Sequence, residues 1–113
     1  MKKLDIILKS EKLDDLKAAL NEIGVKGLIY SVVKGYGNSQ GYEQMYRGKV
    51  YTTDLLTMVK AEVVVKEEMF ELAKDTVIKA VKTGIPGDGK IFVYDVYEVI
   101  KISTGEKNED ALV

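Results

Sequence analysis

The chain has 113 residues, of which 46% are hydrophobic and 31% charged, a composition typical of one soluble globular domain. Its 17 basic and 18 acidic residues give a formal net charge of −1, which disfavours a protein held on nucleic acid by phosphate contacts. Cysteine and histidine are both absent from the sequence, which excludes thiolate chemistry and removes the commonest general base and transition-metal ligand. Because no signal-peptide pattern or long apolar run is present, we expect a cytoplasmic protein.

The first third of the chain predicts a strand, a helix and a second strand. Residues 4–8 alternate between apolar and other residues, as in a half-buried strand. Ser10 stands where we expect a helix N-cap, and apolar residues at helical spacing lead from it to Gly24, a typical C-terminal stop. Residues 28–34 then predict the second strand.

The second half predicts a strand, a helix and a last strand. Residues 59–65 alternate between small apolar and charged residues, and residues 91–96 are rich in strand-forming residues. Between them, residues 67–82 predict a helix whose apolar stripe consists of Met69, Leu72, Ala73, Thr76, Val77 and Ala80. We expect residues 99–102 to form a short strand or coil, and the polar tail 105–113 to be frayed.

The resulting order, βαββαβ, predicts an α+β fold of the ferredoxin-like type, with two helices on one face of an antiparallel sheet. The second and fourth strands are apolar at both alternating positions, which indicates that both of their faces are covered. Because no sequence remains to supply a second layer, we expect the chain to self-associate.

Between the second and third strands lies an unusual segment, residues 35–51, with four glycines and four tyrosines in seventeen positions. One interpretation is a disordered insertion with incidental tyrosines. A long loop inside a compact domain is more often functional, and the glycines at its base would admit a ligand. The residues that resemble interface anchors are Tyr42, Tyr46, Arg47 and Tyr51.

A second glycine-rich stretch, "TGIPGDGKIF" at residues 83–92, has the spacing G-x-x-x-x-G-K from Gly84 to Lys90. It is not a Walker loop, because Ile91 replaces the Ser or Thr that holds magnesium and because the loop leads from a helix into a strand. A plain turn remains one interpretation. Three glycines are more than such a turn needs, which favours close approach of another group, an anion above all.

Several segments resemble the PII nitrogen-regulatory signal proteins, over nearly the full length of the chain. These are "KLDDLKAAL" (12–20), "VKGYG" (33–37), "YRGKVY" (46–51), "TGIPGDGKIFVYDV" (83–96) and "STGEKNEDAL" (103–112). The resemblance implies one ferredoxin-like domain, residues 1–113, that forms a homotrimer. It also implies three functional loops: a T-loop at about 36–55, a B-loop at about 83–90 and a C-terminal loop at about 101–113.

The same resemblance implies a regulator rather than an enzyme. Members bind ATP or ADP in clefts between subunits, and many bind 2-oxoglutarate and Mg²⁺ beside the ATP. Ligands set the conformation of the T-loop, which docks on a partner protein. The partner is an ammonium transporter, which brings the protein to the membrane, or an enzyme of nitrogen metabolism. No nucleic-acid partner is implied.

Carried over position by position, the resemblance implies roles for two sets of residues. The nucleotide site would comprise Gly35, Gly37, Asn38, Ser39, Gln40, Glu62, Val64, Gly87, Asp88, Gly89, Lys90, Lys101 and Ser103. The partner-binding tip would comprise Tyr42, Tyr46, Arg47 and Tyr51. Tyr51 stands at the position that some members uridylylate, and a role in contact alone is the alternative for it.

Lys49 and Val50 replace the small and acidic residues usual in the T-loop, and four positions of the implied ligand sites also depart from the family pattern. Lys101 and Ser103 replace arginines that grip phosphate, Ser39 replaces a magnesium-binding glutamine, and Met58 replaces a lysine that pairs with 2-oxoglutarate. Lysine lacks the bidentate fork of arginine, and serine lacks the charge altogether. We therefore expect an adenine-nucleotide site that favours ADP or AMP or binds ATP without oxoglutarate coupling, with the Mg²⁺ and 2-oxoglutarate positions altered or lost.

Three other functions compete with the sensor. A trimeric adaptor would bind one partner constitutively through the T-loop, without sensing an effector. A small nucleotide phosphohydrolase would need Asp54, Glu62 or Asp88 as its base, since histidine is absent. An RNA-binding module of the same βαββαβ order is the weakest alternative, because no strand carries its aromatic motif.

Overall fold

The structure, a computed structural model, describes residues 1–36, 42–46, 49–53 and 56–112. In these ranges its strands and α-helices are β1 (Lys2–Leu8), α1 (Leu13–Glu22), β2 (Ile29–Gly35), β3 (Tyr42–Tyr46), β4 (Lys49–Thr53), β5 (Leu56–Val65), α2 (Phe70–Val81) and β6 (Gly89–Asp95). Three short 3-10 helices accompany them: η1 (Ser10–Lys12), η2 (Glu67–Met69) and η3 (Asn108–Leu112). None of the helices in these ranges is long and apolar enough to cross a membrane.

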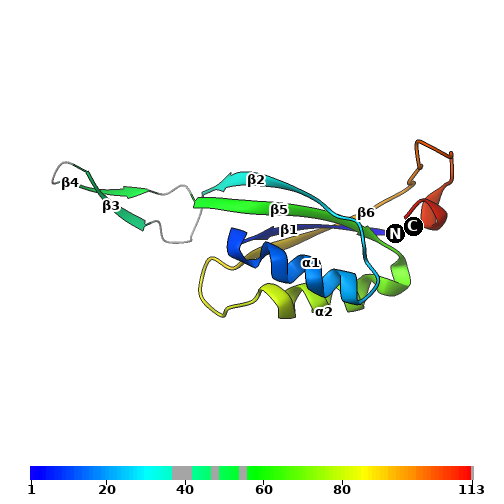
Figure 1. Cartoon of the computed structure of the whole chain (residues 1–113), viewed down its shortest axis with the longest axis horizontal. Coiled ribbons are helices and arrows are strands. Elements are labelled where there is room, and N and C mark those ends of the chain that lie inside the picture. Colours follow the sequence, from blue (N-terminus) through cyan, green and yellow to red (C-terminus); the bar gives the residue numbers. More distant parts are fainter. Residues whose placement is uncertain (37–41, 47–48, 54–55, 113) are drawn as a thin grey trace.

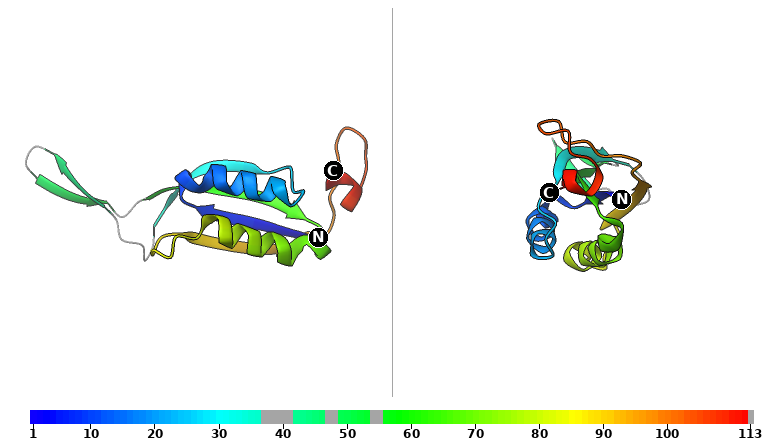
Figure 2. Two further views of the ribbon diagram at one scale, coloured as in Figure 1. Left: turned by 60° about the horizontal axis from the view of Figure 1, so that its bottom comes forward. Right: turned by 90° about the vertical axis from the view of Figure 1, so that its right-hand side faces the viewer.

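Four of the strands form one antiparallel sheet in the order β2-β5-β1-β6. Helices α1 and α2 lie next to each other on a single face of this sheet, and no α-helix of the described residues lies on the other face (Figures 1 and 2). The ferredoxin-like α+β fold predicted from the sequence is therefore confirmed.

The core lies between the sheet and the two helices. Strands β1 and β5 occupy the centre of the sheet, and every second side chain of each points toward the helices. The buried residues of this layer are Leu4, Ile6, Leu8, Leu16, Leu20, Val59, Ala61, Val63, Val65, Ala73, Val77 and Val81. Because β1 is central and alternates strictly, the residues on its other face are fixed on the open side of the sheet.

The helix termini differ in part from the prediction. The expected Ser10 N-cap is wrong, because Ser10 is already the first residue of η1 and no side chain caps that turn. The predicted stop at Gly24 is confirmed. Gly24 has φ +92°, its N–H donates to the Asn21 carbonyl at 3.0 Å, and Val25 N–H donates to the Leu20 carbonyl at 2.9 Å. These two bonds form a Schellman ending.

Helix α2 begins at Phe70, after the 3-10 turn η2, and its buried face is narrower than predicted. The buried positions are Ala73, Val77 and Val81, four residues apart. The spacing predicts Leu72 on the buried stripe, and this prediction is wrong, because its side chain is 50% exposed. The reason is that α2 presents a stripe of small residues to the sheet, which leaves Leu72 at its edge.

The unusual segment at residues 35–51 and the tail at residues 105–113 contain more regular structure than expected. Strands β3 and β4 pair antiparallel, from Tyr42 opposite Thr53 to Tyr46 opposite Lys49, and form a sheet of their own away from the main one (Figure 1). The tail is not frayed through residue 112. It carries an isolated bridge between Ile100 and Lys107 and ends in η3.

Strand β6 begins at Gly89, directly opposite Leu8 at the end of β1. Gly89 has φ +113°, and a Cβ atom there would overlap the carbonyl oxygen of Ile7 and lie 2.7 Å from its carbonyl carbon. Its lack of a side chain thus allows two backbones to approach within the protein itself. The glycine content of this loop predicted the close approach of another group. At Gly89 that group is the backbone of β1.

We expect Gly89→Ala to lower the free energy of unfolding by about 4 kcal/mol or more, since backbone strain and a backbone clash combine. Gly24→Ala is the matched control, because Gly24 has φ +92° but nothing within 4 Å of an added Cβ. Strain alone should cost it about 1–2 kcal/mol. Urea unfolding of both variants measures the difference, and equal losses would contradict the clash.

Candidate functional site

A groove of about 440 Å³ lies where β2, β5 and the α2–β6 loop meet, at the end of the sheet nearest the β3–β4 hairpin (Figure 1). Four residues that the sequence assigned to a nucleotide site line it together: Gly35, Gly87, Gly89 and Lys90. They come from two places far apart in the sequence: the end of β2, and the start of β6 with the loop before it. The fold brings them together because β6 pairs with β1 while β5 pairs with both β1 and β2.

The walls of this groove are largely apolar. Besides the four predicted residues, its lining consists of Ile7, Tyr36, Leu56, Met58, Pro86 and Phe92. Lys90 is the one cationic residue among the described residues that line it, and we call it the Lys90 groove. Such a groove suits a ligand with an apolar body and an anionic end near Lys90.

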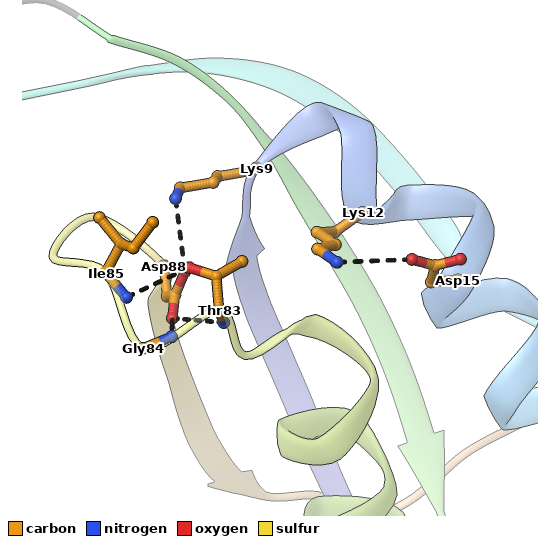
Figure 3. A network of polar contacts seen from close by, with 7 residues as sticks. All are labelled: Lys9, Lys12, Asp15, Thr83, Gly84, Ile85 and Asp88. Atoms are coloured by element: carbon orange, nitrogen blue, oxygen red, sulfur yellow. Dashed lines mark hydrogen bonds and ion pairs between the residues drawn. The ribbon is translucent and has the colours of Figure 1, made fainter.

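Asp88 belongs to the α2–β6 loop, and its carboxylate is hydrogen-bonded to other residues of the protein. It accepts hydrogen bonds from Thr83 N–H at 2.8 Å, from Thr83 Oγ1 at 2.5 Å and from Gly84 N–H at 2.9 Å (Figure 3). Lys9 Nζ, from the end of β1, lies 3.4 Å from Asp88 Oδ1. The Thr83 hydroxyl oxygen also accepts a bond from Ile85 N–H at 3.2 Å, so the turn is tied at several points.

These partners stabilise the ionised carboxylate. Hydrogen bonds from the Thr83 hydroxyl and N–H, and then from Gly84 and Lys9, hold the pKa of Asp88 well below its usual range. Asp88 is thus an anion at neutral pH, and a general base with so low a pKa is a poor one.

A second groove, of about 720 Å³, lies at the opposite end of the sheet, where the two chain termini are found (Figure 1). Glu62 and Val64, two further predicted site residues, line it together with the α1–β2 connection and the end of η3. We call it the Glu62 groove. Met58 and Val64 stand on one strand six residues apart, or about 20 Å along β5. One copy of the chain therefore divides six of the predicted site residues between two separate grooves.

Between the two grooves, the open face of the sheet carries a network of ion pairs. Lys3 Nζ lies 2.8 Å from Glu62 Oε1 and 3.2 Å from Asp5 Oδ1, and Lys60 Nζ lies 3.6 Å from Asp5 Oδ2. The hydrogen bond from Lys3 lowers the pKa of Glu62. Lys60 pairs with Asp5 and does not line the groove beside Met58.

The two remaining described positions lie in the C-terminal segment. Lys101 N–H donates to the Glu106 carbonyl at 2.8 Å, and Gly105 N–H donates to the Lys101 carbonyl at 2.8 Å. Ser103 is exposed in the turn between them. This turn is at the end of the molecule that carries the Glu62 groove, away from Lys90 (Figure 1).

Other predicted positions stay predictions. Gly37, Asn38, Ser39, Gln40 and Arg47, and also Asp54 of the alternative enzyme, lie outside the described residues. Tyr42 and Tyr46 lie in β3 and Tyr51 in β4, and the structure describes the backbone alone at these three positions.

Sequence reasoning did not assign Ile7, Phe92 or Lys9 to the site. Ile7 and Phe92 line the groove, and strand alternation could have placed them on the open face opposite the buried residues. For Lys9 no signal existed, since its contact with Asp88 joins residues 79 positions apart, one after β1 and one before β6.

Comparison with known proteins gives a consistent answer. The model of the family described as "Nitrogen regulatory protein P-II" matches residues 1–106. The chain belongs to the P-II family. It is 46% identical over 112 residues to Nitrogen regulatory protein P-II 1 of Escherichia coli K12, which covers 99% of this chain and 100% of that protein. It is 45% identical over the same shares of both chains to Nitrogen regulatory protein P-II of Pasteurella multocida. The family inferred from the sequence motifs is therefore confirmed.

The low pKa of Asp88 has a consequence for stability. A carboxyl whose folded-state pKa is depressed stabilises the fold above its unfolded pKa of about 3.9, and this contribution is lost as the pH falls toward the folded value. We therefore expect Asp88→Asn to be less stable than the wild type at pH 7, with a difference that shrinks progressively below about pH 4.

Urea midpoints measured from pH 7 to pH 3 test this expectation. The matched control is Asp15→Asn, which removes an exposed ion pair with Lys12 at 3.7 Å and should change the midpoint little. A difference for Asp88→Asn that stays constant over this range would contradict the assigned hydrogen bonds.

Proposed function

We propose that this P-II chain is a regulatory protein that binds an adenine nucleotide, ATP or ADP and with them AMP, between copies of a homotrimer. Binding sets the conformation of the segment between β2 and β5, which then controls a partner protein in nitrogen metabolism. The single observation that carries the proposal is the convergence of Gly35, Gly87, Gly89 and Lys90 on one groove.

The division of the predicted residues between two grooves supports a site shared by two copies. Glu62 and Val64 lie too far along the sheet to join the Lys90 groove of the same copy, and the Lys3–Asp5–Lys60 ion pairs intervene. A neighbouring copy can bring its Glu62 groove to the Lys90 groove of the first. Lys101 and Ser103, at the Glu62 end, would arrive with it.

Exposed apolar residues along both edges of the sheet support association of copies. On β2, Ile29 is 70% and Val32 66% exposed, and on β6 Phe92 is 48% and Tyr94 50% exposed. Residues of this kind are usually covered in a soluble assembly. An uncovered sheet face with two apolar edges is consistent with a closed ring of copies.

The lining of the groove with Gly35 and Lys90 supports a changed response to 2-oxoglutarate. Met58 is 8% exposed and lies against Gly35, where a lysine would put a cation. A dicarboxylate bound here would face an apolar wall with Lys90 alone, and Lys90 is assigned to nucleotide phosphate. A carboxylate without a cation in such a site is unfavourable.

The hairpin β3–β4 is the surface that we assign to the partner protein. It is paired apart from the main sheet and extends the molecule along its longest axis, which measures 59 Å (Figure 1). It carries Tyr42, Tyr46 and Tyr51, and the connection between its strands includes Arg47. An ammonium transporter or an enzyme of nitrogen assimilation is the partner class that the family implies, with Tyr51 as the position for modification.

Titration calorimetry with ATP, ADP and AMP, each with and without Mg²⁺ and 2-oxoglutarate, tests the proposal. We expect nucleotide binding that 2-oxoglutarate does not strengthen. Lys90→Met should weaken nucleotide binding about tenfold or more, because a charge-assisted contact with phosphate is lost. The matched control is Lys79→Met, which removes a lysine in the last turn of α2 that lines neither groove.

Three outcomes would contradict parts of this account. Absence of binding for all three nucleotides would overturn the sensor and leave a constitutive adaptor. ATP-dependent binding of 2-oxoglutarate would overturn the altered pocket, and a partner complex that none of these ligands releases would again favour the adaptor.

A further inference from the structure

The Asp88 carboxylate has no remaining capacity to bind a ligand. A carboxylate offers about four acceptor positions. Here Oδ1 faces Thr83 Oγ1 and Lys9 Nζ, and Oδ2 faces the N–H groups of Thr83 and Gly84. A nucleotide or a metal ion would have to displace one of these partners.

The backbone at residue 88 also separates the carboxylate from the groove. Gly87, Gly89 and Lys90 line the groove that contains Gly35, and Asp88 does not. Asp88 lines an adjacent groove between α2 and β6, which Gly89 and Lys90 border as well. The loop thus presents the backbone of Gly87 to the groove with Gly35, while the Asp88 side chain ties the loop down outside it. Figure 3 shows the carboxylate turned toward its own loop and toward Lys9.

Lys9 joins this loop to the central strand. It follows directly after β1, whose Leu8 pairs with Gly89, so the ion pair and the strand pairing hold the loop from two sides. Lys9 also provides the positive charge that offsets Asp88. Without it, a carboxylate would stand unneutralised behind a groove that has to accept phosphate.

From these contacts we infer that Asp88 and Lys9 are positioning residues of the nucleotide site. Asp88 fixes residues 83–88 through its hydrogen bonds, and Lys9 neutralises it, so that the groove carries no net negative charge from this loop. This inference rests on the proposed nucleotide site and assigns Asp88 a role behind the site in place of direct contact.

The test compares the charge dependence of binding. Lys9→Met should weaken ATP binding about tenfold and AMP binding about twofold, because repulsion by the unpaired carboxylate grows with ligand charge. The double variant Lys9→Met/Asp88→Asn should recover most of the ATP affinity, and Lys9→Arg should retain it. Titration calorimetry at one ionic strength measures all of these variants.

Lys12→Met is the matched control, since Lys12 lies in the same η1 turn region with a similar exposure, 28% against 25% for Lys9. It pairs with Asp15 instead, and its removal should leave nucleotide binding unchanged (Figure 3). Equal losses for ATP and AMP in Lys9→Met would overturn the charge role. A double variant as weak as Lys9→Met would overturn it too, because removing the unpaired carboxylate charge would then restore no affinity.

A second measurement does not depend on nucleotide. Amide hydrogen exchange at Thr83 and Gly84 should accelerate about tenfold or more in Asp88→Ala, which loses both acceptor oxygens, and remain unchanged in Asp15→Ala. Unchanged exchange in Asp88→Ala would overturn the positioning role. If the wild type bound no nucleotide while exchange rose as expected, the proposed function would fail and the loop assignment would stand.

Discussion

The close contact between the backbones of Ile7 and Gly89 determines where the glycine-rich loop can lie. Because β6 starts with a residue that has no side chain, it can pair with β1 up to Leu8. That pairing puts Gly87 and Lys90 in the same groove as Gly35 at the end of β2, although β5 and β1 lie between β2 and β6. It also puts Asp88 within reach of Lys9. Both the groove and the network behind it follow from one steric requirement at the end of the β1–β6 pair.

The same sheet explains why one copy of the chain does not form a complete site. Its buried face is used by α1 and α2, while its open face holds ion pairs in the middle and a groove at each end. A ligand that needs both grooves therefore requires a second copy. In the proposed trimer, the ligand is part of the interface, so binding and the arrangement of copies are coupled. The hairpin lies toward the same end of the sheet as the groove with Lys90 and is placed to respond.

The regular elements and the family could be predicted because they depend on local patterns. Alternation identified β1 and β5, Gly24 identified the end of α1, and the stretch from Thr83 to Val96 identified the family. Features that depend on tertiary packing could not be predicted. The exposure of Leu72, the ordered tail and the contact of Lys9 with Asp88 arise from which face packs and which segments meet. Gly89 was recognised as unusual, but its nearest neighbour is β1, which spacing alone does not show.

The central claim, a nucleotide site completed by two copies, is tested most directly by mixing two defective variants. Lys90→Met damages one groove and Glu62→Gln the other, so each variant alone should bind ATP weakly. Oligomers refolded from a mixture should contain some clefts with Lys90 from one copy and Glu62 from the next, and these should bind ATP with wild-type affinity. Mixed oligomers that bind no better than either pure variant would contradict a site shared between copies.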